Sequence, residues 1–353
     1  MSAINFSQIA PRAFAHPSDA RATSAFKDLP LLPDILKKVS QFSIEEKFRA
    51  DQMCNSIQLG PRQLPSLWRL VHEVADRLGI PAPKAYVSRE GGINAFAFGR
   101  NSHSIVLTTE LVDLMSEKEL TGIIAHEMGH ILCQHMLYMD VGLALSMKSG
   151  AVPGLAKLIP GLEQSVAGLF FAWFRAAEYS ADRAALLILE DPEPLALCLS
   201  RLAGVPKRFE QEFDLRVFAE QAKNYEEEAT LWSKIITFGR GLFLTHPEPA
   251  KRVGAILEWA ESDEYHAIIS GRYLTRFEAE ALDRIQIEGI RSCPLCRSPV
   301  GQAAVCGECG LEQDSRMQQL CPRGHLAGID WNFCKVCGSA IKSAARHSEI
   351  PDC

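Results

Sequence analysis

Apolar residues recur at helical spacing over most of the chain, and one short region departs from that pattern. From Leu31 to about Leu78 the apolar positions follow a helical period, and Gly79 closes the run. Residues 86–99 and 104–109, which read YVSREGGINAFAFG and SIVLTT, are instead rich in aromatic and β-branched side chains. The pattern predicts supporting helices followed by a small sheet of strand, turn and strand.

A second helical pattern follows the predicted sheet. Ser116 and Glu119 have the spacing of a capping box, in which the Ser is the N-cap and the Glu returns a hydrogen bond to it. Apolar side chains then recur on one face and predict a helix that runs to about Met139. The sequence HEMGH, residues 126–130, lies in the middle of this helix.

Two histidines four residues apart project from one face of a helix and can hold the same zinc ion. In HEMGH these are His126 and His130. Glu127 sits one step round the helix, where a carboxylate can take a proton from the attacking water without binding the metal. Gly129 keeps this turn thin enough for another element to approach. The alternative interpretation is coincidence on an amphipathic helix, since so short a motif occurs in unrelated chains.

A further helix, predicted from Phe174 to about Leu189, carries two carboxylates on one face. Glu178 and Asp182 are spaced i and i+4 in an Ala-rich, largely apolar context. Zinc held by two histidines takes a third protein ligand, which Glu178 can supply. Asp182 can then accept the free N–H of a ligating imidazole. The alternative is a solvated acidic face with arginines nearby.

Four motifs occur along the chain in a recognisable order: NAFAFG at 94–99, HEMGH at 126–130, EYSAD at 178–182 and THPEPAKRV at 245–253. Together they resemble the gluzincin metallopeptidases of the HtpX and CAAX-prenyl-protease family. The resemblance covers roughly residues 60–260.

The resemblance implies a mainly helical α+β fold, a zincin-like metallopeptidase domain with a small sheet. It implies that Glu178 is the third metal ligand. His246, with Arg252 behind it, is implied to stabilise the oxyanion that forms during peptide hydrolysis. A peptide substrate is implied to add as a strand beside one segment, Asn94, Ala95 and Phe96.

Better-known members of that family have membrane-spanning helices, and no convincing span is found here. The apolar stretch 141–174 is interrupted by charged residues and prolines, and its longest uncharged end is far shorter than the ~20 residues that a span requires. We predict a mobile hairpin or lid between the two ligand-bearing helices. The apolar run at 166–174, VAGLFFAWF, is predicted to pack in the core, the alternative being peripheral contact with a membrane or an unfolded client.

Composition limits the class of protein and its compartment. With 353 residues, 47% hydrophobic and 23% charged, the chain is typical of a soluble globular protein of two or three domains. Its net charge of −6 gives no general attraction to nucleic acid or to an anionic membrane. The first 30 residues lack the apolar stretch of a secretory signal. A cytoplasmic location and a flexible N-terminus are therefore predicted, with an organelle transit peptide as the alternative.

Seven of the eleven cysteines crowd into residues 293–337, and a reducing compartment favours metal binding over disulfides. The first group has the C-x2-C, nine residues, C-x2-C spacing of a zinc ribbon, with the ligands Cys293, Cys296, Cys306 and Cys309. The second group predicts a similar site from a C-x3-H half and a C-x2-C half, Cys321, His325, Cys334 and Cys337. In this second module a more distant ligand in place of the histidine is the alternative.

These features predict a zinc-dependent metalloendopeptidase that acts on proteins or peptides, with one catalytic and two structural Zn²⁺ ions. Residues 289–353 hold seven Lys/Arg against six Asp/Glu, so the ribbons are predicted to contact protein rather than nucleic acid. The alternative is a non-catalytic adaptor or scaffold that keeps a protease fold and binds proteins through its ribbons. The predicted domains are an N-terminal extension with supporting helices (1–60), the metallopeptidase domain (61–288), the tandem zinc ribbons (289–342) and a flexible tail (343–353).

Overall fold

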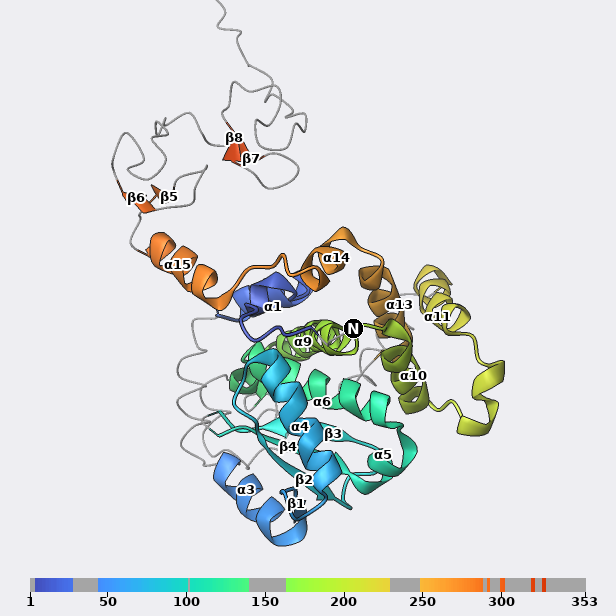
Figure 1. Cartoon of the computed structure of the whole chain (residues 1–353). Coiled ribbons are helices and arrows are strands. Elements are labelled where there is room, and N and C mark those ends of the chain that lie inside the picture. Colours follow the sequence, from blue (N-terminus) through green and yellow to red (C-terminus); the bar gives the residue numbers. More distant parts are fainter. Residues whose placement is uncertain are drawn as a thin grey trace, which may run out of the picture. The chain divides into compact units, whose positions relative to one another are not determined.

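A computed structural model describes most of the chain (Figure 1). The described residues are 4–27, 44–100, 102–139, 163–228 and 248–287, with 291–292, 299–301, 319–320 and 326–327. The chain divides into two compact units, Met1–Arg276 and Phe277–Cys353. The first unit is mainly helical with a small mixed sheet, as predicted.

The first unit holds most of the described helices, including those that carry the site residues. They are α1 (Pro17–Lys27), α3 (Ile44–Asn55), α4 (Pro65–Leu78), α5 (Thr109–Leu114), α6 (Glu117–Leu132), α9 (Glu163–Leu189), α10 (Pro192–Ala203), α11 (Leu215–Glu228), α13 (Pro249–Ala260) and α14 (Asp263–Ile269). Short 3-10 turns lie at Pro11–Ala13 and Lys207–Glu212. Helix α6 packs against the sheet, α4, α9 and α10, so its middle is enclosed on several sides (Figure 1).

The N-terminal segment is part of this core, and the prediction of a flexible N-terminus is wrong for residues 4–27. Phe6, Ile9 and Phe14 are completely buried. The guanidinium of Arg276 donates to the backbone carbonyls of Ile9, Leu78 and Gly79, which ties the segment to the end of α4. Helix α1 packs along α9. Side chains of α1 are therefore close to the helix that carries Glu178.

The sheet has four strands in the order β1-β2-β4-β3. Strands β2 and β4 are parallel, and the two other neighbouring pairs are antiparallel. Residues 86–99 contain parts of two strands rather than the single strand predicted, because the chain turns at Gly91 and Gly92, both with positive φ. The strands are β1 (Ile57–Gln58), β2 (Lys84–Ser88), β3 (Ala95–Phe98) and β4 (Ser104–Thr108).

Helix α6 begins as predicted and ends earlier. Ser116 Oγ accepts from the backbone N–H of Glu119, and the Glu119 carboxylate accepts from the backbone N–H of Ser116, which completes the capping box. The same Glu119 lies 2.9 Å from the guanidinium of Arg201 on α10. The helix ends at Leu132 rather than near Met139, because Gln134 adopts a left-handed φ of 60° and turns the chain.

Helix α9 starts at Glu163, well before the predicted Phe174. Trp173 is completely buried and Phe170 is 5% exposed, so the core interpretation of these two aromatic residues is confirmed. Residues 140–162, which make up most of the predicted lid, lie outside the described residues. Within the described ranges, no helix combines the length and the apolar character that crossing a membrane demands.

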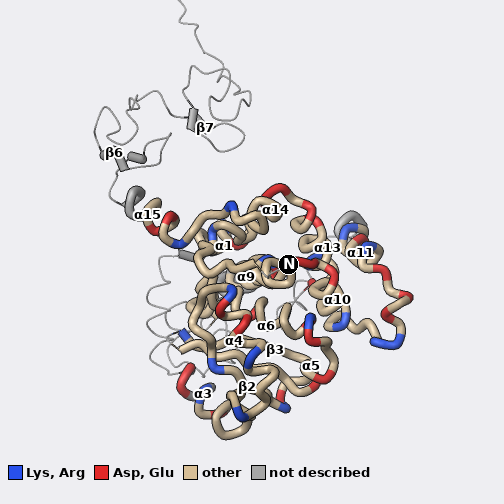
Figure 2. Tube along the Cα trace, in the orientation of Figure 1, with Lys and Arg blue, Asp and Glu red and all other residues tan. Residues whose placement is uncertain are grey.

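Charges of both signs are interspersed along the described elements of the first unit (Figure 2). In the second unit, α15 begins at the boundary (Arg276–Ile287), and two strand pairs follow: β5 (Arg291–Ser292) with β6 (Pro299–Gly301), and β7 (Gln319–Leu320) with β8 (Leu326–Ala327). Both pairs are antiparallel. In the sequence, β5 and β6 flank Cys293 and Cys296, and β7 and β8 flank Cys321 and His325.

Candidate metal centre

Helices α6 and α9 meet at Gly129, and this contact brings the predicted metal ligands together. A Cβ atom at Gly129 would lie 2.8 Å from the Cβ of Ala184 and 3.0 Å from the Cα of Ala181. Only a residue without a side chain lets α9 approach so closely, as predicted. The contact sets His126 and His130 of α6 against Glu178 of α9.

The three donor groups are spaced as zinc requires. His126 Nε2 lies 3.2 Å from His130 Nε2. The carboxylate of Glu178 lies 3.6 Å from His126 Nε2 through Oε2 and 3.2 Å from His130 Nε2 through Oε1. A tetrahedral site with bonds of about 2.0–2.1 Å has edges of about 3.3–3.4 Å between its ligand atoms. Two imidazole nitrogens and the Glu178 carboxylate at this spacing fit zinc and leave a fourth position.

All three groups are buried, and so is the second carboxylate of α9. Glu178 and Asp182 are each 1% exposed. The alternative of a solvated acidic face is therefore wrong. Carboxylates in such a setting need compensating charge or a metal.

Asp182 and Arg252 support His126. The Nδ1 of His126 lies 3.0 Å from Asp182 Oδ1, to which it donates when its Nε2 faces the ion. Arg252 of α13 donates to both oxygens of Asp182, at 2.7 and 2.6 Å, and its Nη1 lies 2.8 Å from Glu178 Oε2. A single guanidinium thus pairs with the expected ligand Glu178 and with the carboxylate behind His126.

Arg252 and the carboxylates of Asp182 and Glu178 favour each other's charged forms. Burial would raise the pKa of Asp182, but Arg252 and His126 lower it below its ordinary value. Burial would lower the pKa of Arg252, but Asp182 and Glu178 raise it. Burial lowers the pKa of His126, which favours the neutral imidazole that a metal requires.

His130 is supported by two residues that the sequence interpretation missed, His135 and Asp19. His130 Nδ1 lies 2.8 Å from His135 Nδ1, and His135 Nε2 lies 3.1 Å from Asp19 Oδ2. Asp19 belongs to α1 and is 4% exposed. No periodic pattern marks these residues, because Asp19 and His135 are 116 positions apart.

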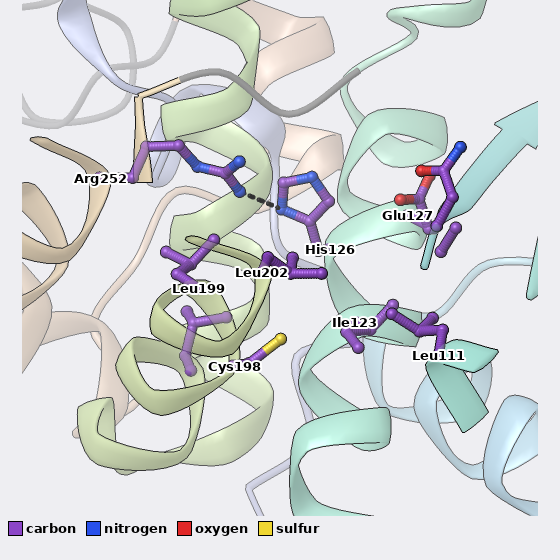
Figure 3. Close-up of a pocket in the computed structure, with 11 residues that line it drawn as sticks. Leu111, Ile123, His126, Glu127, Cys198, Leu199, Leu202 and Arg252 are labelled. Carbon is purple, nitrogen blue, oxygen red and sulfur yellow. Dashed lines mark hydrogen bonds between the residues drawn. The ribbon is translucent and has the colours of Figure 1, made fainter. Parts of the chain in front are cut away.

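An apolar pocket opens beside the donors (Figure 3). Its lining consists of Asn94, Ala95, Leu111, Ile123, His126, Glu127, Leu195, Cys198, Leu199, Leu202 and Arg252. Figure 3 shows Arg252 directed toward His126, with Glu127 on the other side of that imidazole. Burial raises the pKa of Cys198, which disfavours the nucleophilic thiolate.

Several predicted residues lie outside the described part of the chain. His246 is one of them, and so are all the predicted ribbon ligands: Cys293, Cys296, Cys306, Cys309, Cys321, His325, Cys334 and Cys337. Both ribbons and the oxyanion role of His246 stay predictions. Of the predicted substrate strand, Ala95 and Phe96 lie in β3, which is last in the sheet order, and Asn94 precedes it.

A His-His-Glu donor set on two packed helices, with a second glutamate beside the first histidine, is typical of metallopeptidases with an HExxH helix. The family model of peptidase family M48 matches residues 61–260, which is more than half of the chain. The chain therefore belongs to peptidase family M48. The resemblance to HtpX-type proteases stated from the motifs is confirmed.

Three similar proteins illustrate the relationship. The chain is 30% identical over 262 residues to the plastoglobule-localized metallopeptidase 48, chloroplastic, of Arabidopsis thaliana, covering 72% of this chain and 74% of that protein. It is 28% identical over 244 residues to a protease HtpX homolog of Ralstonia pickettii, covering 61% and 81%. The crystal structure of S. mikatae Ste24p aligns with a TM-score of 0.41 and 20% identity, over 67% of this chain and 60% of that one.

Proposed function

We propose that the protein is a zinc-dependent metalloendopeptidase that hydrolyses peptide bonds in proteins or peptides. His126, His130 and Glu178 hold the ion, and Glu127 is the general base. The observation that carries the proposal is the buried donor triangle, with ligand atoms within 4.8 Å of one another, at the edge of a pocket that Glu127 also lines. Membership of a peptidase family supports the same function.

The residues divide the reaction among them. A bound zinc ion supplies a Lewis acid that polarises the scissile carbonyl and acidifies water. Glu127 is 2% exposed and lines the pocket beside His126, where it accepts a proton from the attacking water and returns it to the leaving amine. Asp182 and Arg252 hold His126, and Arg252 also holds one oxygen of Glu178.

The substrate lies along β3 in this proposal. Asn94 and Ala95 line the same pocket as Glu127, so a main chain that follows this strand brings its peptide bond to the general base. The remaining lining is mostly aliphatic, from Leu111, Ile123 and α10. An apolar substrate side chain next to the cleaved bond is therefore expected to bind best.

Three further predictions belong to this function. His246 stabilises the oxyanion. The two C-terminal zinc ribbons bind a protein, either a substrate or a second copy of the chain. The protein acts in the cytoplasm, although the relative from Arabidopsis is named as chloroplastic.

Two glutamate variants test the proposal. Glu127→Gln removes the proton acceptor and leaves the metal ligands intact, so hydrolysis of casein should fall about 10²–10⁴-fold while zinc content is unchanged. Glu178→Gln changes a ligand, so both zinc and activity should be lost. Glu117→Gln is the matched control, because it makes the same chemical change at an exposed position of the same helix. It should keep both.

The readouts are cleavage of unstructured casein or of a quenched peptide library, and zinc content, for all four proteins. A Glu127→Gln enzyme that cleaves as fast as the wild type would refute the general-base assignment. A wild type that cleaves nothing under reducing, zinc-replete conditions would favour the adaptor function instead.

A further inference from the structure

His135 reaches the metal centre because α6 stops short. Gln134 turns the chain with its left-handed backbone, and the backbone N–H of His135 donates to the carbonyl of His130 at 2.9 Å. The imidazole of His135 stands edge-on to Trp173, with ring centroids 5.6 Å apart. The ring is 2% exposed and is held between His130 on one side and α1 on the other.

A metal ion bound by His130 would set the direction of the hydrogen bonds behind that ring. Asp19 is ionised, because its contacts lower its pKa although burial alone would raise it, and a carboxylate only accepts. His135 therefore donates to it from Nε2. A ligating His130 carries its lone pair on Nε2, the atom that faces His126 and Glu178, so its Nδ1 donates to the Nδ1 of His135.

Asp19 is fixed by several donors. Ser180 of α9 donates to its Oδ2 at 2.6 Å, and Thr23 of α1 donates to its Oδ1 at 3.1 Å. The indole of Trp173 donates to the hydroxyl of Thr23 at 2.9 Å. The carboxylate therefore has a defined position relative to α9, the helix that carries Glu178. Helix α1 lies outside the region that the family model matches.

We propose that Asp19 and His135 are positioning residues of the metal centre, which hold the proton of His130 on Nδ1 and thereby aim its Nε2 lone pair at the ion. The inference rests on the proposed function, because it assigns His130 as a metal ligand. The N-terminal segment then contributes to the metal centre through Asp19 of α1. Neither residue touches the substrate in this role.

An isosteric pair of variants separates positioning from packing. His135→Leu and His135→Asn have the same branched shape, but only the Asn side chain places an acceptor where His135 Nδ1 stands. In the full chain, His135→Leu should lower zinc affinity about 10–100-fold, and His135→Asn should keep most of it. Asp19→Asn should lower the affinity about tenfold, because its amide can donate to His135 and reverse the hydrogen-bond direction.

Zinc affinity is measured by competition with a chelator on metal-stripped protein. The ion that the wild type binds and Glu178→Gln does not bind defines the site. Asp113→Asn, an exposed change of the same type, is the control. If His135→Leu and His135→Asn lose the same zinc affinity, His135 contributes only by packing, and the proposal is overturned. If His135→Leu fails to fold, an Asp19→Asn protein that binds zinc like the wild type would overturn it as well.

The proposed function can fail separately. If Glu178→Gln binds as many zinc ions as the wild type, the metal centre itself is wrong, and the positioning inference falls with it. If Glu178→Gln loses its ion but both Asp19→Asn and His135→Leu bind normally, the metal centre stands and only the positioning inference is wrong.

Discussion

The Nδ1 of His126 contacts a carboxylate directly, whereas the Nδ1 of His130 reaches one through a second imidazole. The first support consists of Asp182 and Arg252, both within the region shared with the peptidase family. The second consists of His135 and Asp19, and Asp19 comes from α1 outside that region. Two ligands of one ion are thus oriented by different parts of the chain.

The two supports also differ in charge. Asp182 is neutralised by a bidentate arginine, which at the same time compensates Glu178. Asp19 has hydroxyl and imidazole donors instead. The first support therefore affects the stability of the whole fold, while the second acts mainly on the orientation of one ligand. The first two predictions below test this difference.

The largest effect is expected for Arg252→Met. The change leaves two buried carboxylates without their cation, and breaking a buried pair by removing one partner costs about 3–5 kcal/mol. Urea unfolding of the metal-free chain measures it. Arg62→Met, at an exposed arginine, is the control and should change stability by less than about 0.5 kcal/mol. If Arg252→Met is as stable as the wild type, the claim that the first support stabilises the whole fold through its charges is wrong.

A smaller effect is expected for Asp182→Asn, which should weaken zinc binding about 10–100-fold. Combined with Asp19→Asn, the losses should multiply, because the two carboxylates act on different histidines and share no bond in the described network. Chelator competition on the two single variants and the double variant measures the coupling. A coupling free energy well above about 0.5 kcal/mol would show that the supports act as one unit.

Local sequence patterns were sufficient to group Asp182, the carboxylate of the first support, with the expected ligands. Glu178 and Asp182 lie one turn apart on a helix, and His126 and His130 do the same, so spacing alone indicates which side chains share a face. Spacing could not show which arginine neutralises the carboxylates of Glu178 and Asp182, because Arg252 lies 70 residues from Asp182 in the sequence. The family resemblance implied that Arg252 lies behind His246 near the metal. The structure shows in addition that Arg252 forms ion pairs with Glu178 and Asp182.

The second support could not be found in this way. A helix that continued to Met139 would have carried His135 round to another face than His130. The break at Gln134 has no glycine or proline to announce it. Asp19 lies in a segment without helical periodicity, and the burial of Phe6, Ile9 and Phe14 depends on partners far along the chain.

The smallest effect is expected for Gly129→Ala, which alters both supports at once. The new methyl group would meet α9 at Ala181 and Ala184, and such overpacking costs about 1–3 kcal/mol, partly offset by the better helix propensity of Ala. Gly254→Ala is the matched control in helix α13, where the nearest atom is 3.6 Å away. Thermal melts should show a lower Tm for Gly129→Ala and an equal or higher one for Gly254→Ala. The reverse order would contradict the close approach of α6 and α9.

The central claim is that His126, His130 and Glu178 hold a zinc ion beside Glu127, and elemental analysis of the full chain tests it most directly. We predict about three zinc ions per chain in the wild type, about one fewer in Glu178→Gln, and no change in Glu127→Gln. The difference between the two glutamate variants does not depend on how many ions the C-terminal region binds. Equal zinc content in the wild type and in Glu178→Gln would contradict the claim.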